Sequence, residues 1–222
     1  MRVGILGSGL MGGKLGTLFA RAGHEVTFSY ARSKEKLNRL AREAGAKARA
    51  GTPREAAQAA DAILLAVHWL RIDDVLSQAG DLSGKVIVSC SLPLDAANTE
   101  LVLGHTTSGA EALAKKLPGT ELVSAFNNIP SEVLFSVFEA RGKATPPSML
   151  YCGDQQLGKD IAAIIIRDVG FDPVDLGSLS SARYTEPLAM IIAHLAYGGA
   201  EGPQLAYRFE RFERQHCGKD GH

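Results

Sequence analysis

The stretch 2-RVGILGSGLMGG-13 decides the fold of this chain. Residues 2–6 form a short apolar run typical of a buried strand, and a helical pattern extends from about residue 10 to residue 22. Between them, Gly7, Gly9 and Gly12 have the spacing G-x-G-x-x-G. In this context the glycines allow a tight turn, a close backbone approach to a pyrophosphate and close helix packing. The helix N-terminus offers unpaired N–H groups to phosphates, so the stretch predicts a dinucleotide-binding unit.

Apolar runs and helical patterns alternate from this stretch onward. The sequence predicts strands at 25–30, 46–48, 61–67, 85–90 and 121–126, and helices at 33–44, 53–58, 73–79 and 111–117. Such alternation is typical of βαβ units built on a parallel sheet. We therefore predict an α/β fold of the Rossmann type, doubly wound around a mostly parallel sheet.

The last third of the chain follows a weaker pattern. It predicts a strand at 149–152, a helix at 154–169, an extended segment at 171–176 and a long apolar helix at 178–197. A helix with so much apolar surface must be buried in this chain or against a partner. We predict a single domain over residues 1–211, with a core at 1–145, a C-terminal extension at 146–211 and a flexible tail at 212–222.

Composition narrows the class of protein. The 222 residues have a formal net charge of zero, with 45 % hydrophobic and 22 % charged residues, which is typical of an ordinary globular chain and disfavours nucleic-acid or membrane-surface partners. Cys90, Cys152 and Cys217 are far apart and form no C-x-x-C pair, so we expect neither a metal site nor disulfides. The sequence contains no uninterrupted apolar run of about 18 residues, so we expect no membrane span. We expect a cytoplasmic protein.

The end of the second predicted strand indicates the cofactor. Enzymes that use NAD normally place an acidic side chain there, bonded to the ribose 2′-hydroxyl. This chain instead has Ser29, Tyr30 and Ala31, followed by Arg32, Ser33 and Lys36. Guanidinium, hydroxyl and ammonium groups suit a 2′-phosphate, which a carboxylate would repel. The pattern predicts NADP(H), although the same charges would also suit the solvated start of a helix.

Other side chains follow the predicted strands where ligands bind in open α/β sheets. His68 and Trp69 come after the strand at 61–67, and Trp69 is the one tryptophan of the chain. Asn127 and Asn128 follow the strand at 121–126 and could hold a carboxamide or a flat heterocycle. The alternatives are strand-end packing for Trp69 and turn formation before Pro130 for the two asparagines. His68 is the single candidate for a proton donor.

The chain resembles the deazaflavin-dependent NADP oxidoreductases, in which NADP and a deazaflavin exchange a hydride. The segments that carry the resemblance are 7–13, 23–26, 67–69, 86–93, 125–130, 152–154 and 175–179, together with Ala182 and Arg183. The same core occurs in the cytosolic domain of the six-transmembrane metalloreductases and in pyrroline-5-carboxylate reductase. The resemblance covers residues 1 to about 211 and implies a homodimer that acts on a small-molecule substrate.

The resemblance and the motifs together define a set of predicted site residues. The cofactor contacts are Gly7, Ser8, Gly9, Leu10, Met11, Ser29, Tyr30, Arg32, Ser33, Lys36, Ala66, Val67, His68, Trp69, Ser89, Ala125 and Asn127. The substrate-side contacts are Trp69, Asn128, Ile129, Pro130, Gly177, Ser178 and Leu179. The resemblance implies that 7–11 hold the pyrophosphate, 30–33 the 2′-phosphate, and 67–69 with 125–127 the nicotinamide.

Three functional hypotheses follow from these residues. The first is hydride transfer between NADP(H) and a deazaflavin or flavin-like acceptor, which needs mainly positioning because the ring carries its own chemistry. The second is NADPH-dependent reduction of a small imine or carbonyl, which needs a proton source such as His68. The third is a non-catalytic module that senses NADP, since the sequence has no convincing catalytic acid.

Overall fold

The computed structural model describes residues 1–212. Within them, one sheet contains eight strands in the order β3-β2-β1-β4-β5-β6-β7-β8. The strands are β1 (Arg2–Leu6), β2 (Glu25–Ser29), β3 (Ala48–Ala50), β4 (Ala62–Leu65), β5 (Val86–Ser89), β6 (Glu121–Ala125), β7 (Ser148–Gly153) and β8 (Asp172–Asp175). All neighbouring pairs are parallel except β6 and β7, which are antiparallel. The predicted fold class, a mostly parallel Rossmann-type sheet with a C-terminal helix, is confirmed.

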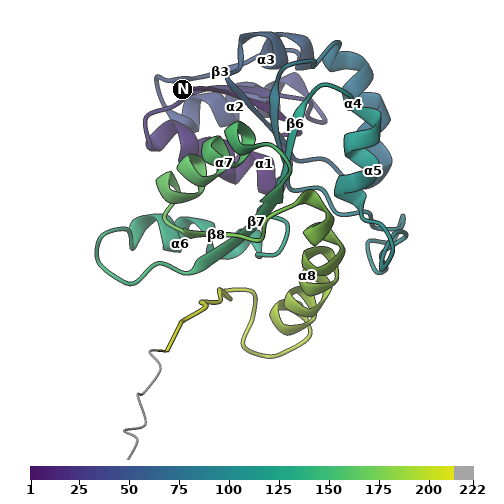
Figure 1. Ribbon diagram of the computed structural model, residues 1–222. Coiled ribbons are helices and arrows are strands. Elements are labelled where there is room, and N and C mark those ends of the chain that lie inside the picture. The colour runs from purple at the N-terminus through teal and green to yellow at the C-terminus, as the bar shows by residue number, and fades with distance from the viewer. Residues whose placement is uncertain (213–222) are drawn as a thin grey trace, which may run out of the picture.

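Helices cover both faces of the sheet (Figure 1). They are α1 (Leu10–Arg21), α2 (Lys34–Ala44), α3 (Pro53–Ala59), α4 (Ile72–Ala79), α5 (Gly109–Lys116), α6 (Leu134–Glu139), α7 (Gln156–Asp168) and α8 (Ala182–Tyr197). Buried residues of α1, α2, α6 and α7 form one apolar cluster with the sheet, and those of α3, α4, α5 and the start of α8 form a second. The sheet is therefore the middle of three layers.

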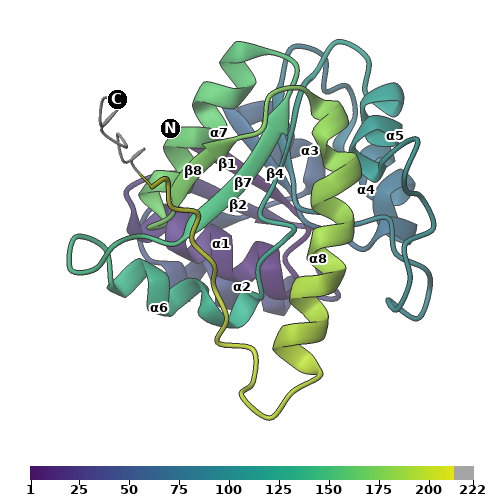
Figure 2. The same cartoon turned by 60° about the horizontal axis from the view of Figure 1, so that its bottom comes forward.

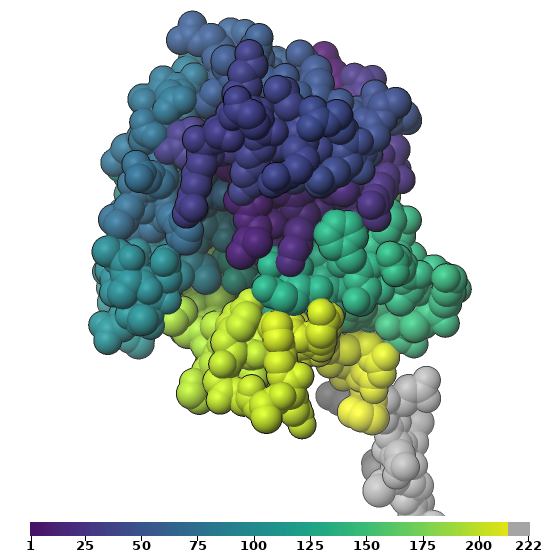
Figure 3. Space-filling view, turned by 180° about the vertical axis from the view of Figure 1, so that it is seen from behind, coloured from purple at the N-terminus to yellow at the C-terminus, as the bar shows by residue number. Residues whose placement is uncertain are grey.

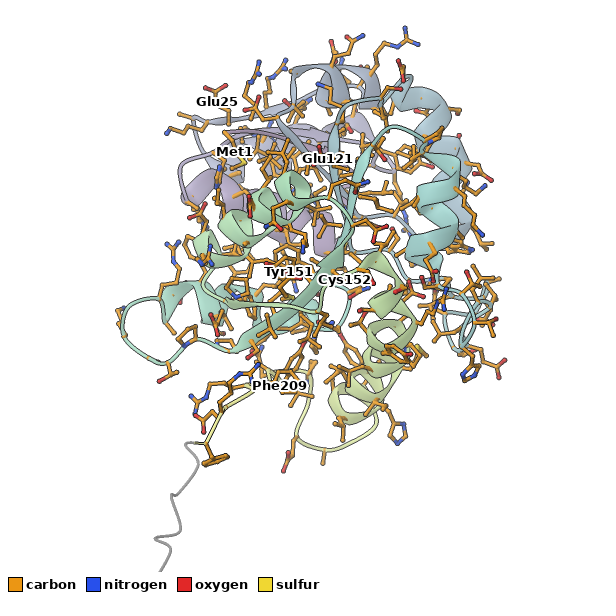
Figure 4. The ribbon with its side chains drawn as sticks, in the orientation of Figure 1. Met1, Glu25, Glu121, Tyr151, Cys152 and Phe209 are labelled. Atoms are coloured by element: carbon orange, nitrogen blue, oxygen red, sulfur yellow. The ribbon has the colours of Figure 1, made fainter. Side chains whose placement is uncertain are left out.

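Successive strand residues alternate between these two clusters. Leu64 of β4 belongs to the first cluster, whereas its neighbours Ile63 and Leu65 belong to the second. Tyr151 and Cys152 of β7 divide in the same way and are both labelled in Figure 4. Because both faces are covered, the central strands β4 and β5 are buried along their whole length and almost entirely apolar, instead of alternating with exposed polar residues. This is why the sequence shows short continuous apolar runs.

Local signals fix the starts of α2 and α3. The Ser33 hydroxyl accepts a hydrogen bond from the backbone N–H of Lys36, as expected of an N-cap. Thr52 and Glu55 form a reciprocal capping box at the start of α3, with Pro53 in the first turn.

Two predicted elements need correction, and one helix was missed. The strand expected at 46–48 lies at β3, two residues later, because Gly45 has a φ of 102° and the chain must first turn after α2. The helix expected from residue 178 begins at Ala182, after a 3-10 turn at Leu179–Ser181. Helix α6 was not predicted, because its 6 residues are too few for a periodic pattern.

The segment after α8 returns to the sheet (Figure 2). The backbone N–H of Ser148 donates to the carbonyl of Tyr207, and the N–H of Phe209 donates to the Ser148 hydroxyl. Among residues 1–212, no helix combines the length and apolar character needed to span a bilayer. The tail predicted at 212–222 lies outside the described residues from position 213 onward.

Candidate functional site

A groove of about 1580 Å³ lies over the carboxyl ends of β1, β2, β4 and β5. It is lined by the glycine loop after β1, by the loop after β2 with the start of α2, and by the loops after β4 and β5. In Figure 3 the surface is hollowed where purple N-terminal residues meet blue and teal residues from later in the chain. Parallel strands bring their carboxyl ends to one edge, which is where open α/β sheets bind ligands.

The glycine loop is shaped by close backbone contacts. Gly7 has a φ of 110°, and a Cβ there would lie 2.3 Å from the carbonyl oxygen of Ala66. A Cβ on Gly12 would lie 1.8 Å from the carbonyl oxygen of Gly7. A Cβ on Gly9, by contrast, would meet no atom within 4 Å, so this position faces open space in the groove. No side chain caps the N-terminus of α1, and the loop therefore fits a dinucleotide pyrophosphate.

The buried side chain of Ser8 fastens this loop to β2. Its hydroxyl donates to the carbonyl of Ser29 at 2.8 Å, and its backbone N–H donates to the carbonyl of Tyr30 at 3.0 Å. The hydroxyl of Ser29 donates to the carbonyl of Ile5 at 2.7 Å. Ser29 is fully buried and lies beneath the groove instead of lining it.

Cations gather at the β2 end of the groove. The exposed Arg32 and the half-buried Lys36 both line it, as does Ser33. No acidic side chain stands at the end of β2 itself. Asp74 of α4 nevertheless reaches this corner, where it accepts a hydrogen bond from the hydroxyl of Tyr30. Sequence reasoning missed Asp74 because nothing in the local pattern links residues 30 and 74.

The opposite end of the groove is lined by Ala66, Val67, His68 and Trp69. His68 is exposed, and its Nδ1 lies 3.1 Å from Oδ1 of Asn98 in the loop after β5. This contact was also missed by sequence reasoning, since Asn98 adopts a left-handed conformation in an irregular loop.

Two polar residues after β5 shape the wall beside His68. The hydroxyl of Ser91 donates to the carbonyl of Val67 at 2.8 Å. Ser89 is buried, and its hydroxyl accepts from the N–H of Ser91. Cys90 lines the groove, but burial raises the pKa of its thiol to about 12. This cysteine is therefore a neutral thiol and unsuited to act as a nucleophile.

The predicted contacts at the end of β6 and just after it are buried and do not line the groove; they are Ala125, Asn127, Asn128, Ile129 and Pro130. The side-chain amide of Asn127 donates to the hydroxyl of Ser124 at 3.1 Å. The Oδ1 of Asn128 accepts from the hydroxyl of Tyr207 at 2.7 Å, whereas its Nδ2 is buried without a partner. These side chains form a polar layer beside the groove, closed by the segment after α8.

The structure does not bring Gly177, Ser178 and Leu179 to this layer. Asp175 of β8 lies level with Tyr151, which in turn pairs with Ala125 of β6. β8 runs in the opposite direction to β6. After Asp175 the chain therefore moves away from the carboxyl end of β6, to a level midway along that strand, where the carbonyl of Gly177 accepts from the N–H of Gly153. The N–H of Leu179 donates to Asp154. None of these three residues lines the groove.

Comparison with known proteins tests the family resemblance. Residues 2–93 match the family model described as NADP oxidoreductase coenzyme F420-dependent, and coenzyme F420 is a deazaflavin. The predicted resemblance is confirmed. Over 189 residues the chain is 32% identical to metalloreductase STEAP3 of Rattus norvegicus, with 85% of this chain covered. The chain spans 36% of that relative's length.

Two solved structures share the fold of this chain. One is a proposed F420-dependent NADP reductase from Arthrobacter sp. FB24, with 22% identity and a TM-score of 0.81 over 94% of this chain and 99% of the other. The second is the hypothetical protein SMa0349 from Sinorhizobium meliloti, with 29% identity and a TM-score of 0.71 over 82% and 87% of the two chains.

Proposed function

We propose that this protein is an oxidoreductase that transfers a hydride between NADP(H) and a deazaflavin or flavin-like acceptor. The observation that carries the proposal is the groove itself. It joins a glycine loop open toward ligand at Gly9 to a cluster of cations at the end of β2. The match of residues 2–93 to F420-dependent NADP oxidoreductases supports the same reaction.

Each part of the groove has a separate task in binding NADP(H). The backbone of residues 7–11 and the uncapped start of α1 hold the pyrophosphate. Arg32, Ser33 and Lys36 hold the 2′-phosphate, for which a guanidinium can form two parallel hydrogen bonds. Val67, His68 and Trp69 border the nicotinamide, which supplies or accepts the hydride when the cofactor is bound. The residues of the groove orient two rings and exclude water.

The character of the nicotinamide end favours a flat acceptor. Trp69 is half-buried there, and its ring packs against the buried cluster formed by α3, α4 and α5. A flavin-like ring needs an aromatic or apolar wall and close alignment more than an acid, because the ring carries its own chemistry. Among residues 1–212, no group of three or more His, Cys, Asp or Glu side chains is placed to hold a metal ion.

We also propose that the protein forms a homodimer through α8. Along α8, Tyr184, Ile191 and Leu195 are 76%, 57% and 58% exposed. Their spacings of seven and four residues place them along one side of the helix, so that they form an apolar stripe. A second copy that packs on this stripe would bury surface that is costly to leave in water.

One observation favours the second hypothesis, reduction of a small imine or carbonyl. His68 lines the groove at its nicotinamide end, and its contact with Asn98 fixes the ring while leaving Nε2 directed elsewhere. A fixed imidazole is a suitable proton donor. A solvent isotope effect on turnover that disappears in His68→Ala would support this role, and an unchanged rate would exclude it.

The decisive experiment compares NADPH and NADH. Binding of each is measured first, and oxidation is then followed by the absorbance of the reduced nicotinamide with coenzyme F420, FMN or FAD as acceptor. We expect tighter binding of NADPH and rapid oxidation by one of these acceptors. Tight binding with no oxidation by any acceptor, imine or carbonyl would instead support a sensing module.

A further inference from the structure

Tyr30 has an unusual conformation for an aromatic residue. Its φ is 55°, in the left-handed region that non-glycine residues rarely adopt. The hydroxyl donates a hydrogen bond to one carboxylate oxygen of Asp74, and the other oxygen accepts from the amide of Gln78 at 3.1 Å. The Tyr30 hydrogen bond also holds the pKa of Asp74 below its usual range, so the acceptor stays ionised. The side chain is thus held across the groove from β2 to α4.

Tyr30 is also hydrogen-bonded to the glycine loop through its backbone. The carbonyl of Tyr30 accepts from the N–H of Ser8 at 3.0 Å. Its ring is half-buried, packs against the same apolar cluster as Val67 and Leu76, and also lines the groove. One side of the ring therefore rests on the core, which leaves the other available to a ligand.

The charges around Tyr30 identify which half of the dinucleotide reaches it. Arg32 and Lys36 lie at this end of the groove, and the 2′-phosphate of NADP belongs to the adenosine half. The pyrophosphate site at residues 7–11 separates this end from His68 and Trp69. The ring that comes next to Tyr30 is consequently adenine and not nicotinamide.

We propose that the ring of Tyr30 is the surface on which adenine stacks, and that Asp74 is the positioning residue that holds it there. The inference rests on the proposed function, since it concerns the same cofactor. An aromatic ring fixed before binding loses no rotamer freedom when the base arrives, so more of the stacking energy appears as affinity. Asp74 contributes by this restraint and without touching the cofactor.

The test uses two classes of hydride donor. NADPH and NADH both contain adenine, whereas reduced nicotinamide mononucleotide does not. Tyr30→Gly removes the ring and suits the left-handed backbone, so the fold is retained. We expect this variant to bind NADPH and NADH about 5- to 100-fold more weakly, in the range of one base stacked on an aromatic ring. Turnover with the mononucleotide stays as in the wild type.

Asp74 is tested by rescue. We expect Asp74→Ala to raise KM for NADPH several-fold with kcat unchanged, and Asp74→Asn, which keeps an acceptor for the Tyr30 hydroxyl, to restore most of the affinity. Arg32→Ala is the matched control, because it should weaken NADPH and spare NADH.

Two results would overturn the adenine site. One is wild-type affinity for both dinucleotides in Tyr30→Gly, and the other is an equal loss with the mononucleotide, which would indicate a general structural role. Failure of the proposed function looks different, since the wild type itself would then either bind neither dinucleotide or bind NADPH without passing its hydride to any acceptor.

Discussion

Replacing Glu186 by glutamine should change how the stability of this protein depends on pH. Glu186 is 1% exposed on α8, and its two carboxylate oxygens accept from the backbone N–H groups of Gly109 and Ala110 at 2.8 and 2.9 Å. It therefore joins the C-terminal helix to the start of α5. Burial raises the pKa of this carboxyl, and the two N–H groups oppose the shift only in part.

The sign of the effect follows from this direction. A pKa raised in the folded state means that folding favours the protonated form. The stabilisation is complete below the pKa of the unfolded chain, near 4.5, and is lost as the pH rises through the folded value. Across that window the wild type should lose stability relative to Glu186→Gln, with a slope of at most about 1.4 kcal/mol per pH unit. Because glutamine does not titrate, the pH dependence of the difference in stability between the two proteins reports on Glu186. The contributions of titratable groups that both proteins share cancel in that difference.

The assay is urea unfolding followed by circular dichroism at several pH values from about 4 to about 8. Glu139→Gln, at an exposed position on α6, is the control and should give a curve parallel to the wild type. Glu186→Ala should cost about 2–5 kcal/mol at neutral pH, because it leaves two buried N–H groups without an acceptor. If the wild type and Glu186→Gln differed by the same amount at every pH, the reasoning would be refuted.

Three further predictions concern the groove. Arg32→Ala should weaken NADPH binding by about 1.5–3 kcal/mol and leave NADH unaffected, and calorimetric titration with equal losses for both would remove the 2′-phosphate assignment. Gly12→Ala should prevent folding of the loop because its Cβ would lie 1.8 Å from a backbone oxygen, whereas Gly9→Ala should keep the melting temperature and lose cofactor affinity. Asn98→Ala should free His68 and lower kcat with an imine or carbonyl substrate; an unchanged kcat would show that this contact is irrelevant to turnover.

The sequence predicts elements best where the signal is local. The glycine spacing and the apolar runs of the central strands each act within a few residues, as do the caps that the structure shows at Ser33 and Thr52. The contacts of Glu186 with α5 and of Tyr30 with Asp74 join residues 77 and 44 positions apart. Neither a periodic pattern nor a helix cap predicts such pairs, because they depend on which helices the sheet brings together.

The reversal between β6 and β7 explains why the strand-end rule brings some of the predicted contacts to one edge of the sheet and leaves others elsewhere. The loops after β1, β2, β4 and β5 all follow parallel strands, so one rule places them at the same edge of the sheet. After β6 the chain turns back, and β8 leads to Gly177 at the level of Val123, midway along β6, and not at the edge formed by the carboxyl ends of the parallel strands. The polar layer beside the groove is completed instead by Tyr207, whose hydroxyl reaches Asn128 from beyond α8. Selectivity for the acceptor should accordingly respond to changes in this returning segment, which no strand-end rule could have identified.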